Sequence, residues 1–279
     1  MKKWSKRVLA LLLVMGLILA LAGCGGAAQE GQQQETKGGE GQSESTTGGA
    51  DQKGKVYVVG TEPTFPPFEY TDEKTNEITG FDIELIKAIA EEAGIKVTVQ
   101  SLGFDGLIPA LQAGSIDIVI AGMSVNPERA ESVDFGPAYF EAGLKIAVVS
   151  DSNEINSVDD LKGKTVAVQI GTTGALKAQE LKDAGIVKEI KTYNTVDVVF
   201  LELINGTVDA VINDLPVNEA YMAKNPGKVK MVGDVLEGEE YAFAVAKGNT
   251  ELLEKLTDGL AKVKDSGEFE ELTIKYFGS

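Results

Sequence analysis

The stretch Leu107–Asp117, LIPALQAGSID, combines an amphipathic helix pattern, a glycine turn and the start of an apolar strand that an aspartate opens. A second stretch, Leu201–Asp209 (LELINGTVD), repeats the same order of helix, glycine turn, aspartate and strand. Alternating helices and strands are typical of α/β proteins. Two separate units of this kind predict two similarly built lobes rather than one continuous sheet.

The alternation continues on both sides of these stretches and predicts an α/β fold with largely parallel sheets. Apolar residues at helical spacing, ended by glycine in several cases, predict helices, and short aliphatic runs predict strands. The helices are expected at 81–93, 104–113, 173–184, 196–204, 216–224, 250–266 and 268–276. The strands are expected at 55–60, 95–100, 117–120, 144–149, 165–169, 187–192, 209–212 and 241–246.

Residues 1–23 have the pattern of a processing segment and are set apart from the fold. Four basic residues precede an apolar run at 8–22, interrupted by Gly16, that is shorter than the ~20 residues of a membrane-spanning helix. The run ends in Leu-Ala-Gly-Cys and resembles a lipoprotein signal peptide, so we expect Cys24 to become the lipidated first residue. The alternative is an ordinary secretory signal with an incidental cysteine. Cys24 is the one cysteine of the sequence, which excludes an internal disulfide.

Residues 24–53 are expected to be the lipidated cysteine and a flexible linker. Residues 25–53 are rich in Gly, Gln, Glu, Ser and Thr and contain no aromatic or β-branched aliphatic residue. Such a segment buries too little apolar area to offset the entropy lost on ordering. A linker of this length has a reach of about 30 Å, which would keep the domain near a membrane partner.

The composition excludes several classes of function. After removal of residues 1–23 the chain has 22 basic and 43 acidic residues, a net charge of −21, which argues against binding nucleic acid or anionic lipid. The sequence contains no histidine, the commonest general base and metal ligand. We therefore expect no metal site and no catalytic residue.

Arg129 is the one arginine that remains after processing, against 21 lysines. A position that keeps arginine in such a lysine-rich chain indicates a need for a planar, bidentate guanidinium. The alternative is a surface salt bridge with Glu128 or Glu131, which would contribute about 0–1 kcal/mol.

Several sequence blocks, in a fixed order, carry a resemblance to a known family. The blocks are GTEPTFPPFE (60–69), GFD (80–82), AGMSVNPER (121–129), DF (134–135), VAVQIGTTG (166–174) and DAVIND (209–214). They resemble the amino-acid-binding proteins of ABC importers, solute-binding protein family 3, over residues 55–277. The resemblance implies a two-lobe, periplasmic-binding-protein-like fold with a hinge of two crossover strands near 139–143 and 237–241. Lobe 1 would comprise 54–140 plus 241–279, and lobe 2 would comprise 143–237.

The resemblance also implies a set of residues for a zwitterionic ligand. The ligand carboxylate would be held by Arg129, as a bidentate ion pair, and by the helix start at Thr172 and Thr173. The alternative role for that helix start is a plain N-cap turn. The ligand ammonium would be held by the Gly122 carbonyl, the Ser124 hydroxyl and the Asp214 carboxylate.

Asp214 follows an expected strand, and ligands bind at the carboxyl ends of strands in open α/β sheets. Its alternative role is to cap the next helix. Phe65 and Phe104 match aromatic positions that cover the ligand side chain, and core packing is the alternative for both.

Three further residues, Glu62, Gln169 and Asn213, would approach the distal part of the ligand. One carboxylate and two amides suit glutamine or a basic amino acid. An acidic ligand would place its carboxylate near Glu62 with no cation to offset it.

The function implied is therefore binding by hinge closure and delivery of a polar amino acid to the ABC permease in the membrane. The protein would be a monomer without cofactor, anchored at the extracytoplasmic face of the membrane through Cys24. Two alternatives remain open on the same scaffold. One is an enzyme that uses carboxylates such as Glu62 or Asp214, and the other is a ligand-sensing module.

Overall fold

The structure is a computed structural model that describes residues 54–278, within one compact unit that spans Asp51–Ser279. The expected signal segment, the lipidated Cys24 and the linker at 24–53 lie outside the described residues. No helix between residues 54 and 278 is both long enough and apolar enough to cross a membrane.

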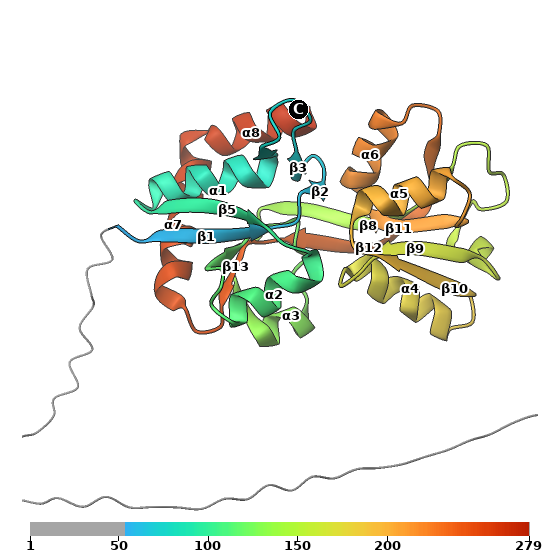
Figure 1. Ribbon diagram of the computed structural model, residues 1–279, viewed down its shortest axis with the longest axis horizontal. Coiled ribbons are helices and arrows are strands. Elements are labelled where there is room, and N and C mark those ends of the chain that lie inside the picture. Colours follow the sequence, from blue (N-terminus) through green and yellow to red (C-terminus); the bar gives the residue numbers. More distant parts are fainter. Residues whose placement is uncertain (1–53, 279) are drawn as a thin grey trace, which may run out of the picture. The chain divides into compact units, whose positions relative to one another are not determined.

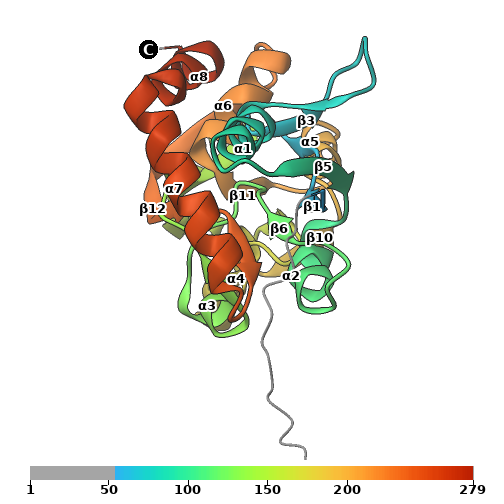
Figure 2. The same cartoon turned by 90° about the vertical axis from the view of Figure 1, so that its left-hand side faces the viewer.

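One five-stranded sheet forms the first lobe, on the left in Figure 1, with strand order β5-β1-β6-β13-β7. Its strands are β1 (Val56–Thr61), β5 (Lys96–Ser101), β6 (Ile118–Val119), β7 (Val133–Phe135) and β13 (Ala244–Ala246). Strand β1 is parallel to β5 and β6, whereas β13 is antiparallel to β6 and β7. The helices of this lobe are α1 (Phe81–Glu92), α2 (Phe104–Gln112), α3 (Pro127–Ser132), α7 (Thr250–Ser266) and α8 (Glu268–Phe277). Helices α7 and α8 lie on the side of this lobe that faces the viewer in Figure 2.

A second five-stranded sheet forms the second lobe, with strand order β10-β9-β11-β8-β12. Its strands are β8 (Phe140–Val149), β9 (Thr165–Gln169), β10 (Glu189–Tyr193), β11 (Ala210–Asp214) and β12 (Val229–Tyr241). A 3-10 turn at Val158–Leu161 and helices α4 (Thr173–Asp183), α5 (Val196–Ile204) and α6 (Leu215–Lys224) complete it. Each sheet contains two parallel and two antiparallel strand pairs. The expected α/β fold is confirmed, but the sheets are mixed rather than largely parallel, because the crossover strands return in the opposite direction.

The repeated helix–glycine–aspartate–strand pattern at 107–117 and 201–209 corresponds to the same interaction in both lobes. In the first lobe the Val58 N–H donates to Asp117 Oδ2 over 2.8 Å, and the Asp117 N–H donates to the Val58 carbonyl over 2.8 Å. In the second lobe the Thr165 N–H donates to Asp209 Oδ2 over 2.7 Å, and the Asp209 N–H donates to the Thr165 carbonyl over 2.9 Å. Each aspartate therefore ties the strand that it opens to the first strand of its own helix–strand repeat.

Strands β8 and β12 connect the lobes as an antiparallel ribbon (Figure 1), paired from Phe140 with Tyr241 to Val149 with Val229. The register shifts between Val232 and Glu237. The sequence predicts a single strand at 241–246, but the structure divides this segment. Strand β12 ends at Tyr241, and β13 starts at Ala244 in the other sheet. The two crossover strands expected for the hinge are thus present, and they are hydrogen-bonded to each other as an antiparallel pair.

A third, small sheet follows β1 and was not predicted. It pairs β2 (Thr64–Phe65), β3 (Glu69–Thr71) and β4 (Ile78–Thr79) in antiparallel fashion. Next to it, the Phe68 ring packs edge-on against Phe140, 4.8 Å between centroids, and against Tyr241, 5.1 Å. This aromatic packing fixes the small sheet beside the hinge, at the edge of the cleft between the lobes.

Candidate functional site

A small enclosed cavity lies where the two lobes meet, and residues of both lobes line it. Its lining consists of Phe65, Phe104, Gly122, Ser124, Arg129, Gln169, Thr172, Thr173, Asn213 and Asp214. These ten residues all belong to the predicted set. The eleventh, Glu62, is joined to this lining by a hydrogen bond from Gln169. The structure therefore brings all of the predicted site residues together.

Helix α3 positions Arg129 at the cavity. The side chain of Asn126 caps this helix by accepting a hydrogen bond from the Arg129 N–H over 2.8 Å, and Pro127 occupies the first turn. The Arg129 guanidinium donates to the Ser124 carbonyl over 2.7 Å and to the Gly171 carbonyl over 3.1 Å, which joins the two lobes. It also lies 5.3 Å from the centroid of the Phe104 ring.

The Arg129 side chain is only 8% exposed, which does not fit the alternative of a surface salt bridge. Burial lowers the pKa of this guanidinium, whereas the nearby Glu239 and Asp214 raise it. A guanidinium stays protonated in proteins. Arg129 therefore places a buried, fixed positive charge in the cavity.

The turn before α4 brings backbone N–H groups to the opposite wall. Thr172 caps α4, because its hydroxyl accepts from the Ala175 N–H over 3.1 Å and donates to the Gln169 carbonyl over 2.8 Å. The N-cap alternative is thus realised, and it keeps the first turn of α4 directed at the cavity. Such a helix start attracts anions, so the cap and an anion site are compatible here.

Asp214 occupies the N-cap position of α6 but makes no capping hydrogen bond with its side chain. Its carboxylate instead accepts a hydrogen bond from the Tyr241 hydroxyl of the hinge. Burial raises the pKa of Asp214 well above its usual value, and the nearby charge of Glu239 is the second largest cause of this increase. The carboxylate is only 6% exposed and lines the cavity, where a positively charged ligand group would stabilise its ionised form.

Gly122 and Ser124 follow strand β6 and line the cavity together with Asp214. Gly122 has a positive φ of 49°, and a Cβ at this position would lie 2.5 Å from the Phe65 ring. Glycine is required by both the conformation and the close approach of Phe65. Phe65 is therefore packed on the backbone of the site itself.

Glu62 and Gln169 meet across the cleft, from the ends of β1 and β9. The Gln169 side-chain amide donates to the Glu62 carboxylate over 3.0 Å and to the Asn194 carbonyl over 3.0 Å. The Thr64 hydroxyl approaches the same carboxylate at 2.8 Å. Burial raises the pKa of Glu62, and the hydrogen bonds from Thr64 and Gln169 oppose this.

Asn213 faces the same region, and its amide donates to the side-chain oxygen of the fully buried Asn218 over 3.3 Å. In return the Asn218 amide donates to the Asn213 carbonyl over 3.1 Å. The orientation of Asn213 is therefore set by a buried partner, and not by the cavity.

Sequence reasoning missed two residues of the hinge strand β12, Glu239 and Tyr241. Glu239 interacts with the hydroxyls of Thr173 and Ser124 and with the charge of Arg129, and burial raises its pKa. Its Oε2 is buried without a hydrogen-bond donor among residues 54–278. Side chains alternate along a strand, so Glu239 and Tyr241 lie on the same face of β12. This alternation could have identified both residues, but only if β12 had been predicted to continue to Tyr241.

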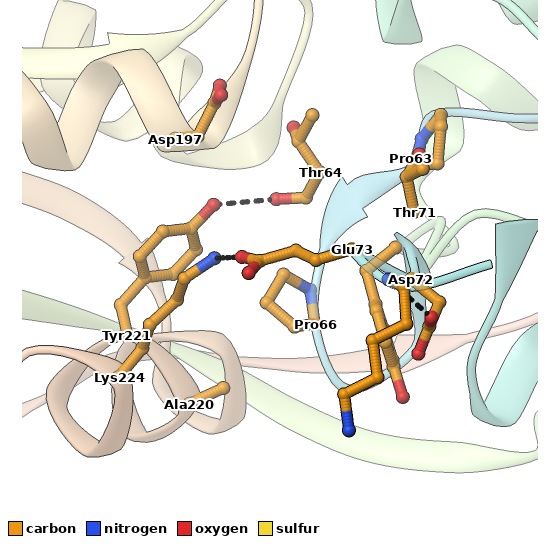
Figure 3. Close-up of a pocket in the computed structure, with 12 residues that line it drawn as sticks. Pro63, Thr64, Pro66, Thr71, Asp72, Glu73, Asp197, Ala220, Tyr221 and Lys224 are labelled. Carbon is orange, nitrogen blue, oxygen red and sulfur yellow. Dashed lines mark hydrogen bonds and ion pairs between the residues drawn. The ribbon is translucent and has the colours of Figure 1, made fainter. Parts of the chain in front are cut away.

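The lobes also meet at a larger cavity that opens between the β2–β3 region and α6 (Figure 3). The Tyr221 hydroxyl donates to the Thr64 carbonyl over 3.0 Å, and Lys224 forms a salt bridge with Glu73 over 3.0 Å. The Val196 N–H also donates to the Thr64 hydroxyl over 3.0 Å. Thr64 thus links Glu62 to the second lobe.

Similarity to known proteins defines the class of this protein. Residues 57–279 match the bacterial extracellular solute-binding proteins, family 3, and the chain belongs to this family. Its relatives and structural neighbours are substrate-binding proteins and not enzymes, which agrees with the expectation against catalysis.

Two relatives illustrate the similarity. The chain is 34% identical over 279 residues to an arginine-binding extracellular protein of Bacillus subtilis (strain 168), which covers 99% of this chain and 98% of the relative. It is 37% identical over 224 residues to a putative ABC transporter arginine-binding protein 2 of Escherichia coli (strain K12), covering 78% of this chain and 88% of the relative.

Solved structures support the fold. An ancestral arginine-binding protein bound to arginine superposes with a TM-score of 0.76 at 47% identity, covering 80% of this chain and 98% of that one. An ancestral arginine-binding protein bound to glutamine gives a TM-score of 0.76 at 46% identity, with the same coverage. An arginine-, lysine- and histidine-binding protein of Geobacillus stearothermophilus gives 0.75 at 38% identity, covering 81% and 96%.

Proposed function

We propose that this chain binds a polar amino acid, with arginine and glutamine as the favoured ligands, between its lobes and delivers it to an ABC permease. The observation that carries this proposal is the interlobe cavity, which is lined by the buried guanidinium of Arg129 and the buried carboxylate of Asp214 and is joined to the buried carboxylate of Glu62 through Gln169. Relatives that are named as arginine-binding proteins, and a neighbour solved with glutamine, agree with both ligands.

The proposed ligand contacts follow from charge. The α-carboxylate would bind Arg129, as a charge-assisted pair, and the N–H groups at the start of α4. The α-ammonium would bind the Gly122 carbonyl, the Ser124 hydroxyl and the Asp214 carboxylate. These contacts come from both lobes, so they are complete only when the lobes are together.

The side chain of the ligand would extend between Phe65 and Phe104 towards Glu62, Gln169 and Asn213. A guanidinium of arginine would form a bidentate pair with the Glu62 carboxylate, whereas the amide of glutamine would share hydrogen bonds with Glu62 and Gln169. In both cases the ligand replaces the hydrogen bond between Gln169 and Glu62. An acidic side chain would face Glu62 without a cation, which disfavours aspartate and glutamate.

Binding would shift an equilibrium between open and closed lobes. We propose 54–140 plus 241–279 and 143–237 as the moving units, with β8 and β12 as the hinge. A ligand that contacts both units stabilises the closed state by its differential affinity. The closed form is then the species that the permease recognises.

The proposal includes a lipid anchor at Cys24 and a flexible linker at 25–53, which support delivery at the membrane. A short apolar segment ending in Leu-Ala-Gly-Cys motivates the anchor, and a diacylated or triacylated cysteine provides the second acyl chain that stable anchoring needs.

Calorimetric titration of a soluble chain from residue 25, unfolded and refolded to remove bound ligand, tests the proposed function against the twenty amino acids. Saturable binding of arginine, of glutamine or of both is expected, with aspartate and glutamate as negative controls. If none of the twenty binds, or if glutamate binds best, the proposed function is wrong.

A further inference from the structure

Two buried carboxyl groups beneath the site have no part in the contacts described so far. Glu69 is the first residue of β3 and Asp82 the second residue of α1, and both are completely buried. They come from the sequence blocks GTEPTFPPFE and GFD, of which only Glu62 and Phe65 were assigned to the ligand. Ionised carboxylates are costly to bury, so a fully buried pair requires an explanation.

Asp82 is bound directly to the backbone of the proposed ammonium site. Its Oδ2 accepts from the Gly122 N–H over 2.8 Å and from the Tyr139 hydroxyl over 2.7 Å. Gly122 is also one of the residues that line the cavity. The carboxylate of Asp82 therefore fixes the residue whose carbonyl is proposed to accept from the ligand.

The surroundings of the two carboxyl groups suit a single shared proton. Three carboxyl oxygens, both of Glu69 and Oδ1 of Asp82, are buried and have no hydrogen-bond partner among residues 54–278. The two carboxyl groups are nevertheless neighbours. A proton on one of them supplies a donor between them, and like charges at this distance oppose ionisation of both. Burial, followed by the charge of Asp82, raises the pKa of Glu69 well above its usual value. A proton shared by the pair therefore favours Glu69, which leaves the negative charge on Asp82.

Backbone contacts hold the segments that carry the two carboxyl groups close together. Gly80 has a φ of 130°, and a Cβ there would lie 2.2 Å from the Phe68 carbonyl oxygen. The next two N–H groups donate to the loop before β3, Phe81 to Pro67 over 3.0 Å and Asp82 to Phe68 over 2.9 Å. Strand β3 and helix α1 are thus joined next to both carboxyl groups.

We propose that Asp82 and Glu69 form a proton-sharing pair that positions Gly122 and holds one negative charge beneath the ammonium end of the ligand site. The inference rests on the proposed function and extends it to two residues that do not touch the ligand. A purely structural role would need only a neutral acceptor for the Gly122 N–H and the Tyr139 hydroxyl, whereas an ionised carboxylate is costly to bury. Electrostatic attraction between this buried charge and the ammonium group of the ligand would strengthen ligand binding.

Matched variants separate the charge from the hydrogen bonds. Asp82→Asn keeps an acceptor for the Gly122 N–H and the Tyr139 hydroxyl but removes the negative charge. Glu69→Gln keeps a donor towards Asp82, because an amide N–H replaces the shared proton. Both variants are nearly isosteric, and the melting temperature without ligand reports whether each variant folds.

We expect Asp82→Asn to weaken binding of arginine or glutamine by about tenfold at pH 7.5, through the loss of a nearby unit charge. Glu69→Gln is expected to bind within about threefold of the wild type, since the charge on Asp82 remains. Equal affinity of Asp82→Asn and the wild type would overturn the inference, as would a Glu69→Gln variant that loses as much affinity as Asp82→Asn.

The pH profile provides a readout that a structural role would not change. The titratable groups that face the pair are Tyr139, Glu62 and Asp214. Because Glu62 and Asp214 titrate in both proteins, the ratio of wild-type to Asp82→Asn affinity isolates Asp82. This ratio is expected to fall towards one as the pH decreases from 7.5 to 5, and a constant ratio would contradict the proposal.

The Gly122 amide resonance tests the pair without ligand. In ¹⁵N-resolved spectra of the full soluble chain, its proton shift is expected to titrate with Asp82 and to be insensitive to pH in Asp82→Asn. If the wild type binds no amino acid, the proposed function fails, and this inference about ligand positioning fails with it even where the resonance titrates. If the wild type binds and the variants behave alike, only the inference fails.

Discussion

The side-chain amide of Gln169 donates a hydrogen bond over 3.0 Å to the carboxylate of Glu62, from the end of a strand in one lobe to the end of a strand in the other. The bond closes the distal end of the cavity, and both partners are nearly inaccessible, at 3% and 4% exposure. If the proposed ligand contacts are right, this buried carboxylate stabilised by an amide decides which amino acid side chains the site accepts.

Glu62→Gln tests that selection. We expect arginine affinity to fall by about 10- to 100-fold, because the charge-assisted pair is lost, while glutamine affinity changes by less than about threefold. Calorimetry with both ligands measures the two changes. Glu270→Gln, an exposed glutamate on α8, is the matched control, and equal losses for both ligands would contradict the assignment of Glu62.

Arg129→Lys tests the carboxylate clamp. An ammonium cannot reproduce the planar fork that contacts Ser124 and Gly171, so amino-acid affinity is expected to fall at least about tenfold. The melting temperature of the ligand-free protein should change little. Lys188→Arg, an exposed exchange of the same residue types, serves as the control, and unchanged affinity of Arg129→Lys would exclude the clamp.

Glu239→Gln tests the coupling of hinge and site. Burial and the neighbouring charge of Glu239 both raise the pKa of Asp214, so removing that charge should lower it. Protonation of Asp214 weakens its attraction for the ligand ammonium, and affinity should therefore decrease as the pH falls.

In Glu239→Gln this decrease should begin at a lower pH than in the wild type. Titrations at a series of pH values between 4.5 and 8 locate the midpoint. Glu240→Gln changes the adjacent exposed position of β12 and should leave the midpoint in place; an identical midpoint for Glu239→Gln would rule out the coupling.

The stability of the fold should also depend on pH through Asp82. Burial raises the pKa of Asp82 from 3.8 to about 6. Between these values the folded state binds more protons than the unfolded state, so the contribution of Asp82 to stability is present at low pH and is lost as the pH rises through 6.

Relative to Asp82→Asn, the wild-type free energy of unfolding is therefore expected to decrease by about 2 kcal/mol between pH 4 and pH 7, since each pKa unit corresponds to about 1.36 kcal/mol and part of the change lies below pH 4. Denaturant unfolding of both proteins at four pH values gives this difference. The exposed exchange Asp265→Asn is the control, and a difference that is constant or rises with pH would show that Asp82 is not protonated in this range.

Cys24→Ser tests the lipid anchor. The variant is expected in the soluble fraction of cells that retain the wild type in the membrane fraction, because it lacks the acylated thiol. Fractionation with immunodetection measures the distribution. A Cys24→Ala variant should behave in the same way, and a serine variant that still sediments with membranes would refute the anchor.

Much of the fold could be predicted because its longer elements carry local signals. Helices at 196–204 and 250–266 are confirmed to the residue, since apolar spacing and bounding residues define both. The strands of β2 and β4 have only two residues each, and no periodicity can be read from so short a segment. The same holds for α3, which was missed although Arg129 was identified.

The site was predicted from a resemblance spread over several blocks, and geometry then brought its residues together. Glu239, Tyr241, Glu69 and Asp82 were not assigned, because their importance depends on which atoms tertiary folding places beside Asp214 and Gly122. A hydrogen bond from Tyr241 to Asp214 joins residues 27 positions apart, and no local pattern encodes it.

The ribbon of β8 and β12 has a mechanical consequence. Five consecutive pairs, from Phe140 with Tyr241 to Leu144 with Glu237, connect the two crossings. Neither of the two paired segments can bend alone without breaking these backbone hydrogen bonds. The two segments of the hinge are therefore expected to twist together, as one unit. Glu239 and Tyr241 of this ribbon both interact with Asp214, so the structural element that joins the lobes also supplies partners for a carboxylate of the site.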